Sequence, residues 1–158
     1  MQKFLPRESF IESIQSLDYR RLGKQRVEAK QILNVLLNRT ETKGWRNHPI
    51  TKMWRGYEDA LKVYFNMCVK EWIHRGYNNT MELEEMPATP IKYPHWFGDK
   101  RIHSSHRANL LRKDYEFYSK NNWIEDIEAP YVWFDTDKEQ YYEQLVGTKE
   151  RVYLKNIS

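Results

Sequence analysis

The stretch NHPITKMWRGYEDALKVYFNMCVKEWIHRG, residues 47–76, decides the fold of this chain. Apolar and aromatic side chains recur in it every three or four positions, a spacing that places them on one face of a helix. Pro49 is tolerated best in a first helical turn, and Gly76 is typical of a helix end. We therefore predict one long central helix that begins at Pro49. Its apolar face consists of Met53, Trp54, Tyr57, Leu61, Tyr64, Cys68, Trp72 and Ile73.

Capping residues predict further helices around this one. Ser9 is expected to cap a short helix, and Asp18 is expected to cap a longer helix that reaches about Asn38. The remaining predictions are a loop over residues 81–102, a third main helix from Ser104 or Ser105 through Tyr118, and a short helix over residues 137–146.

These elements predict an all-α fold. We expect a compact single domain over residues 1–158, in which three main helices pack around the long central helix. The chain is long enough for one core of ordinary size. It contains no internal repeat, low-complexity tract or glycine-serine linker.

The composition excludes several classes of protein. Charged residues make up 30% and aromatic residues 15% of the chain, which is typical of neither disordered nor membrane-spanning proteins. No run approaches the roughly 20 apolar residues of a spanning helix, and the N-terminus carries charges where a signal peptide is apolar. The single cysteine, Cys68, precludes an internal disulfide and fits a reducing compartment. We expect a monomeric cytoplasmic protein without a cofactor.

Positive charge is distributed unevenly along the chain. Residues 1–40 carry eight Lys or Arg against four Asp or Glu, and residues 92–120 carry seven against three. Residues 121–158 reverse this balance, with four against eight. Two converging basic segments would attract a polyanion, although basic side chains also keep proteins soluble. Charge alone therefore leaves nucleic-acid binding open.

The segment LDYRRLGKQRVEAKQIL, residues 17–33, surrounds one central carboxylate, Glu28, with five cationic side chains. Helical spacing places three other polar residues on the face of Glu28, namely Arg21, Lys24 and Gln31. One interpretation is a surface ion pair between Lys24 and Glu28, worth about a few tenths of a kcal/mol. The cations outnumber the acids, however, and grouped unpaired cations favour phosphate. The other interpretation is therefore a site that holds phosphate beside a reactive carboxylate.

Histidines and tryptophans raise two further questions. His103 and His106 have helical spacing, but no cysteine or acidic ligand follows at a familiar interval, so we expect no metal site. Contacts to phosphate or backbone at a helix start are the preferred interpretation.

Trp45 and Trp96 are predicted to lie in loops beside basic residues, where a base could stack on them.

Three blocks resemble the motifs of the pyrimidine dimer DNA glycosylase family, in the family's order. They are LDYRRLGKQRVEAKQIL at residues 17–33, the stretch from GWRNHPITKMWRGYEDAL to EWIHRGYN at residues 44–78, and PHWFGDKRIHSSHRANLLRKDYEFY at residues 94–118. The resemblance covers about residues 1–120 and is greatest to bacterial and phage relatives of unassigned substrate. It implies a compact all-α domain whose N-terminal segment threads between helices.

The resemblance also implies a catalytic pair. In the family an N-terminal amine attacks C1′ of the damaged nucleotide and forms a Schiff base, and a glutamate on the first long helix assists. Alignment at Leu22 places Glu28 on that glutamate. The family's amine belongs to a threonine exposed by removal of methionine, whereas here the bulky Gln2 should hinder that removal. The nucleophile is then the amine of Met1, or of Gln2 if trimming occurs; Lys24, or water positioned by Glu28, remains an alternative.

The same resemblance implies that duplex DNA containing a damaged base is the partner. Lys3 stands where the family has an arginine, and Arg21 where it has a histidine. The residues expected to contact DNA are Lys3, Arg20, Arg21, Lys24, Arg26, Trp45, Arg46, His48, Trp96, Arg101, His103, His106, Arg107 and Arg112.

We therefore predict a DNA glycosylase that excises a damaged or modified pyrimidine in base-excision repair, with an AP lyase step if an amine is the nucleophile. Two alternatives stay open. One is a non-catalytic nucleic-acid-binding module on the same scaffold. The other is a protein-interaction domain whose acidic residues 121–158 bind a basic partner.

Overall fold

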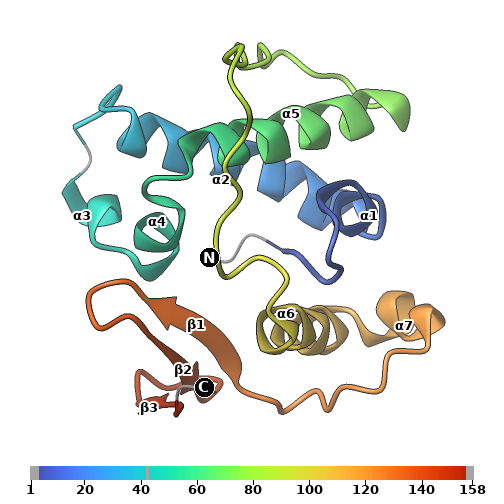
Figure 1. Ribbon diagram of the computed structural model, residues 1–158. Coiled ribbons are helices and arrows are strands. Elements are labelled where there is room, and N and C mark those ends of the chain that lie inside the picture. The colour runs from blue at the N-terminus through green and yellow to red at the C-terminus, as the bar shows by residue number, and fades with distance from the viewer. Residues whose placement is uncertain (1–3, 42, 156–158) are drawn as a thin grey trace. The chain divides into compact units, whose positions relative to one another are not determined.

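The structure is a computed structural model that describes residues 4–41 and 43–155 (Figure 1). The chain divides into two compact units. The first unit comprises Met1–Phe4 and Ser9–Pro94, and the second comprises Leu5–Glu8 and His95–Ser158. Within the described residues, no helix is both long enough and apolar enough to cross a membrane.

The first unit is helical. Two long helices, α2 and α5, pack against each other, and Leu22 and Leu33 of α2 and Leu61 and Phe65 of α5 are buried. The helix α1 also packs against α5. The helices of this unit are α1 (Phe10–Gln15), α2 (Tyr19–Leu36), α3 (Lys43–Arg46), α4 (Pro49–Trp54) and α5 (Glu58–His74).

Both predicted N-terminal caps of this unit are confirmed. The Ser9 side chain accepts a hydrogen bond from the backbone N–H of Glu12, and the Asp18 side chain accepts one from the N–H of Arg21. Each cap satisfies a backbone donor that has no partner within its helix. The caps therefore set where α1 and α2 begin.

The prediction of one long central helix is wrong, because the chain breaks between α4 and α5. Arg55 is extended at φ −61° and ψ 128°, and Gly56 follows at φ +89°, a conformation that favours glycine. Trp54 and Leu61 are both fully buried, so the apolar spacing continues across the break. The predicted end is confirmed: Gly76 has φ +91° just after α5.

The second unit combines helices with a sheet, so the all-α prediction is wrong. Its elements are α6 (Lys100–Lys113), α7 (Tyr115–Tyr118), the short 3-10 helix η1 (Ser119–Asn121), β1 (Tyr131–Asp135), β2 (Gln140–Gln144) and β3 (Arg151–Tyr153). The three strands form an antiparallel sheet in the order β1-β2-β3, and α6 packs against β1.

The short helix predicted over residues 137–146 is replaced by the β1–β2 hairpin. Trp133 pairs with Tyr142 and Phe134 pairs with Tyr141, and the last two rings lie 4.9 Å apart. Aromatic pairs across strands stabilise a sheet, and a short run of apolar residues does not reveal this pairing in advance.

The third main helix begins earlier than predicted. Asp99, not Ser104 or Ser105, is its N-cap, and its carboxylate accepts a hydrogen bond of 2.9 Å from the N–H of Arg101. At its other end Asp114 leaves the helical conformation at φ −153° and caps α7. The predicted helix is therefore two helices, α6 and α7.

Candidate active site

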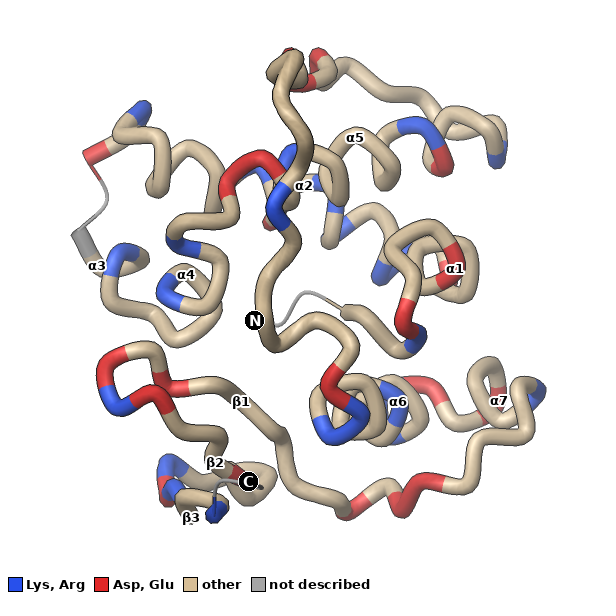
Figure 2. The backbone as a smooth tube through the Cα atoms, in the orientation of Figure 1, with Lys and Arg blue, Asp and Glu red and all other residues tan. Residues whose placement is uncertain are grey.

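The candidate site lies on α2 in the first unit, where Lys and Arg follow one another along the helix (Figure 2). Glu28 is half-buried there, and its carboxylate accepts a hydrogen bond of 3.3 Å from Nε2 of Gln25. Gln25 is buried, with 1% of its surface exposed. A buried amide that contacts the carboxylate restricts the directions in which Glu28 can point.

Gln25 also binds the N-terminal segment. Its Oε1 accepts a hydrogen bond of 3.0 Å from the backbone N–H of Phe4, and the hydroxyl of the buried Tyr64 lies 3.0 Å from the same oxygen. The Tyr64 hydroxyl is also 3.1 Å from the carbonyl oxygen of Phe4. A continuous line of hydrogen bonds thus joins Phe4 through Gln25 to Glu28. Met1, Gln2 and Lys3, predicted as site residues, lie outside the described residues.

Beside Glu28 the surface of this unit is hollowed by a volume of about 490 Å³. The hollow combines polar side chains with two aromatic rings. Its lining residues are Tyr19, Arg20, Gly23, Lys24, Val27, Glu28, Gln31 and Trp72. Small-molecule sites have volumes of about 300–1,000 Å³ and combine apolar walls with a few polar groups, as this hollow does.

Trp72 of α5 forms a fixed wall of the hollow. Its indole Nε1 donates a hydrogen bond of 2.7 Å to the carbonyl oxygen of Asn78. Its six-membered ring lies against Gly23, where an added Cβ would be only 3.1 Å from the ring. The ring of Tyr77 lies 4.4 Å from that of Trp72, and the guanidinium of Arg26 lies 4.8 Å from the indole. Contacts on several sides therefore hold the indole in place.

The ion pair between Lys24 and Glu28, one interpretation of the sequence, does not form. Within the described part of the chain Lys24 has no ion-pair partner, although it lines the hollow together with Glu28. Arg20 is exposed, and its Nε donates a hydrogen bond of 3.1 Å to the Tyr19 hydroxyl. Lys24 and Arg20 are thus the cations placed at the hollow itself.

The other two predicted cations of α2 have structural partners. Arg21 forms an ion pair of 3.3 Å with the capping residue Asp18. Arg26 donates a hydrogen bond of 2.6 Å to Asn79 and lies over Trp72. These contacts tie Arg26 to the wall of the hollow and Arg21 to the first turn of the helix.

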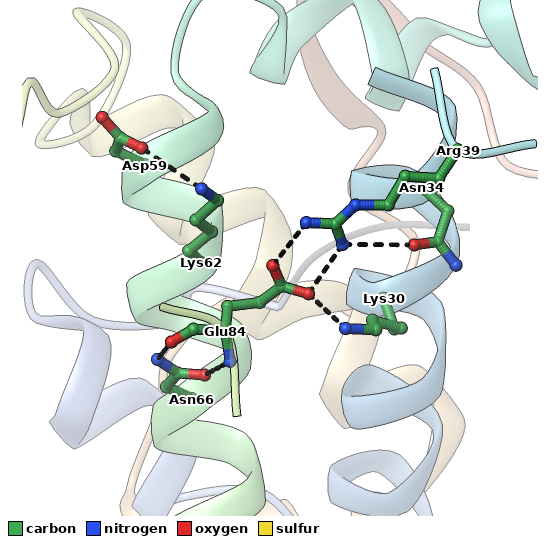
Figure 3. A network of polar contacts seen from close by, with 7 residues as sticks. All are labelled: Lys30, Asn34, Arg39, Asp59, Lys62, Asn66 and Glu84. Atoms are coloured by element: carbon green, nitrogen blue, oxygen red, sulfur yellow. Dashed lines mark hydrogen bonds and ion pairs between the residues drawn. The ribbon is translucent and has the colours of Figure 1, made fainter. Parts of the chain in front are cut away.

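A buried carboxylate anchors α2 on another side (Figure 3). Glu84 accepts two hydrogen bonds of 2.9 Å from Arg39 and a further contact from Lys30 of α2. Its backbone N–H and C=O both bond to the Asn66 side chain on α5, at 2.8 and 2.9 Å. The hydrogen bonds from Arg39, joined by the charge and contact of Lys30, lower the pKa of Glu84 to about 2. This network ties the segment after α5 to both long helices.

The block GWRNHP has local structural roles in the first unit. The His48 ring accepts a hydrogen bond from the N–H of Ile50 and caps α4, and the half-buried Trp45 lies 5.2 Å from the His48 ring. The exposed Arg46 donates to Asn38 over 2.8 Å. None of these three predicted DNA contacts lines the hollow beside Glu28.

Three predicted DNA contacts in the second unit are buried: Trp96, His103 and His106 are at most 4% exposed. The ring of Trp96 is therefore unavailable to a base. The two imidazoles hold Leu5, since His106 Nδ1 accepts from the Leu5 N–H over 2.9 Å and His103 Nδ1 lies 2.6 Å from the Leu5 carbonyl oxygen. Burial lowers the pKa of His103, and lowers that of His106 to about 3, so both rings are neutral at pH 7.

The three predicted arginines of the second unit are engaged in structural contacts. Arg101 pairs with Asp99, and Arg107 pairs with Glu125 at 3.0 Å. Arg112 donates to the carbonyl oxygens of Ile127 and Ala129. Each of these contacts binds the arginine to a carboxylate or carbonyl group of the second unit, so none of the three is singled out as a phosphate ligand.

Sequence reasoning missed the two aromatic residues that line the hollow. Tyr19 was not singled out, and Trp72 was counted only as part of the apolar face of the central helix. One sequence feature pointed to this wall: Gly23 lies within α2, and a glycine within a helix often permits close packing.

Comparison with known families identifies the chain. A family model described as pyrimidine dimer DNA glycosylase matches residues 1–85, which include Glu28 and every residue of the hollow. The third block, residues 94–118, lies beyond that match. No curated protein and no solved structure matches the chain. The matched segment is more than half of the sequence, and the chain belongs to the pyrimidine dimer DNA glycosylase family.

Proposed function

We propose that this protein is a DNA glycosylase that excises a damaged or modified pyrimidine, with its N-terminal amine as nucleophile and Glu28 as the assisting carboxylate. The line of hydrogen bonds from Phe4 through Gln25 to Glu28 carries the proposal. Three residues precede Phe4, and three extended residues span about 10 Å. The proposal requires that this short segment bring the amine to the hollow beside Glu28.

The proposed chemistry needs one amine and one carboxylate. The neutral amine attacks C1′ of the nucleotide, and the bond from C1′ to the base breaks as the base takes up a proton. Positive charge develops on the deoxyribose during this step, and the negative Glu28 beside it lowers the barrier. Of the two protons on the attached nitrogen, one balances the proton taken up by the base, and the other moves to O4′ as the C1′–O4′ bond breaks and the imine forms. An α-amine has a pKa of about 8, so a useful fraction is neutral at pH 7.

The lyase step follows from the same imine. The imine makes the C2′ proton acidic, and loss of that proton expels the 3′ phosphate and nicks the strand. In this proposal Glu28 accepts and returns protons in these transfers. Hydrolysis of the remaining imine releases the protein amine and the cleaved sugar.

The cations at the hollow support duplex DNA as the partner. Lys24 lines the hollow without an ion-pair partner among the described residues, and Arg20 is exposed next to it. Their charges favour a phosphate close to the carboxylate, and they offset its repulsion of the DNA backbone. The acid can then approach the sugar of a bound strand.

Borohydride trapping tests the proposal. Duplexes carrying a pyrimidine dimer, an oxidised pyrimidine or a pre-formed abasic site are incubated with protein and borohydride, and the intact mass of the adduct and its peptides locates the attached amine. We expect an adduct at the N-terminal residue. Glu28→Gln should reduce base release by about 10²–10⁴-fold while DNA binding persists.

Glu12→Gln is the matched control, because Glu12 is an exposed carboxylate of the first unit outside the hollow. It should release base at the wild-type rate. Absence of both adduct and base release over the whole panel would contradict the proposal and leave the two non-catalytic alternatives. Wild-type activity in Glu28→Gln would also contradict the proposal.

A further inference from the structure

A second hollow in the surface of the first unit has no role in the chemistry described so far. It has a volume of about 400 Å³ and lies where α2 ends, beside residues of α3 and the end of α4. Both of these short helices pack against α2. We call it the arginine hollow, because its two charged residues are both arginines. Its lining residues are Val35, Leu36, Asn38, Arg46, Asn47 and Arg55.

Neutral oxygen atoms, not carboxylates, hold the two guanidinium groups of this hollow. Nη2 of Arg46 donates a hydrogen bond of 2.8 Å to Oδ1 of Asn38, and Nη2 of Arg55 donates one of 2.9 Å to the carbonyl oxygen of Arg46. Both arginines are exposed, and among residues 4–41 and 43–155 neither has an ion-pair partner. Each guanidinium carries five N–H donors, so most of these donors remain available to a ligand.

The acidic residues that follow Arg55 in the chain have other partners. Oε1 of Glu58 accepts a hydrogen bond of 3.1 Å from the backbone N–H of Gly56, and Oδ1 of Asp59 lies 3.8 Å from Nζ of Lys62. The residues that line the arginine hollow include no acid at all. Two like charges in one hollow repel each other, and an anion between them offsets this repulsion. The arginine hollow therefore favours an anionic ligand.

The arginine hollow lies on the same face of α2 as Glu28. Residues seven positions apart share a helical face, and Val35 is seven positions after Glu28. At 1.5 Å per residue this separation is about 10 Å along the helix. The phosphates of one DNA strand follow one another at about 3.4 Å along the duplex axis. A strand that runs along α2 from Glu28 therefore brings a phosphate about three nucleotides away to the arginine hollow.

We propose that Arg46 and Arg55 together bind one backbone phosphate of the DNA strand, about three nucleotides from the nucleotide that faces Glu28. This inference rests on the proposed function for the identity of the polymer and for the nucleotide at Glu28. The planar fork of a guanidinium group matches the oxygen atoms of a phosphate, and two forks can hold it from two sides. Val35 and Leu36 add apolar surface for the neighbouring deoxyribose.

Salt dependence tests the phosphate contact without any chemistry. Binding to an undamaged duplex is measured by fluorescence anisotropy over about 50–200 mM salt. The double variant Arg46→Gln/Arg55→Gln should weaken binding about 10-fold and reduce the slope of log K against log salt by about 1, because one phosphate is no longer neutralised. Arg55→Lys keeps the charge and should retain the slope. Lys70→Gln, at an exposed lysine of α5 that lines neither hollow, is the control and should change neither quantity.

Single methylphosphonate substitutions locate the phosphate on the strand. Each one replaces a charged phosphate by a neutral group, at successive positions on either side of a pyrimidine dimer. In a Glu28→Gln background, which prevents turnover, the substitution about three nucleotides from the lesion should weaken binding about 10-fold. Adding Arg46→Gln and Arg55→Gln should abolish the effect of that substitution and leave the effects at the other positions.

Three results would overturn the inference. One is an unchanged salt slope in the double variant. Another is equal sensitivity of the proteins with and without the two arginines at every methylphosphonate position. The third is a loss of stability in urea unfolding without any loss of DNA affinity, which would mean that the arginines serve the fold alone. A wild-type protein without adduct or base release overturns the proposed function instead, and the salt slopes then still decide whether the two arginines bind phosphate.

Discussion

The network around Glu84 gives a prediction whose size follows from the structure. Glu84→Gln removes the negative charge that Arg39 and Lys30 share, and it leaves the two cations facing a neutral amide (Figure 3). The Glu84 side chain is 4% exposed, so water replaces little of the lost interaction. We expect the variant to fold, because the two bonds between Asn66 and the backbone of residue 84 remain.

The shift in the pKa of Glu84 sets the magnitude. A fall from 4.5 to about 2 corresponds to about 3 kcal/mol at 1.36 kcal/mol per unit. The Arg39 side chain is 43% exposed, and solvent screening reduces the figure to about 2 kcal/mol. Glu84→Gln should therefore lower the free energy of unfolding by about 2–3 kcal/mol at pH 7.

The same shift gives the sign of the pH dependence. Because the folded-state pKa is depressed, the stabilisation is fully present above the unfolded pKa of about 4.5 and is lost as the pH falls toward 2. At pH 3.5 the unfolded carboxylate is mostly protonated, which removes about 1.4 kcal/mol of the wild-type advantage. The difference between wild type and variant should therefore shrink between pH 7 and pH 3.5.

Urea unfolding followed by circular dichroism at both pH values measures this difference. Glu85→Gln is the matched control, because it removes an exposed charge from the adjacent position and should change stability by less than about 0.5 kcal/mol. A difference for Glu84→Gln below about 0.5 kcal/mol at pH 7, or one of the same size at pH 3.5, would refute the reasoning.

Three further predictions concern single positions. Lys24→Ala should lower DNA affinity and reduce the slope of log K against log salt by about 1, measured by fluorescence anisotropy; an unchanged slope would exclude a phosphate contact. Burial lowers the pKa of His106 to about 3, so the unfolded chain takes up a proton before the folded protein does as the pH falls below about 6.5. The stability advantage of wild type over His106→Asn should therefore shrink from pH 6.5 to pH 4. A constant difference in urea unfolding would contradict this. Gly56→Ala should lower the free energy of unfolding by about 1–2 kcal/mol, because Gly56 has φ +89°. Gly44 is the control: its φ is not positive, and a Cβ there would have no contact within 4 Å, so Gly44→Ala should not have this effect. Equal effects of the two substitutions would contradict a conformational cause.

Local sequence patterns predicted the elements that depend on neighbouring residues. The caps Ser9 and Asp18 each bond to a backbone group three residues away, so their helices could be located without knowledge of the rest of the chain. The break at Gly56 was also local, but the apolar spacing runs through it and concealed it. The start of α6 was misplaced because the cap was expected at Ser104 or Ser105, whereas Asp99 caps the helix.

The β-sheet could not be predicted in the same way. Trp133 and Tyr142 become partners only when the chain reverses between them, and the same short aromatic runs fit a helix equally well. Cross-strand pairing supplies the energy that decides between the two, and pairing is a property of two segments together. The prediction of an all-α fold failed for this reason.

The sequence alone showed a lone carboxylate, Glu28, within a cationic helix, because α-helical spacing depends only on residue order. The tertiary structure decided what surrounds that carboxylate. Phe4 contacts Gln25 across 21 residues, and Trp72 of α5 lies against Gly23 of α2. Such contacts form when separate segments bury their apolar faces together, and no pattern within one helix specifies which distant side chain will become its neighbour.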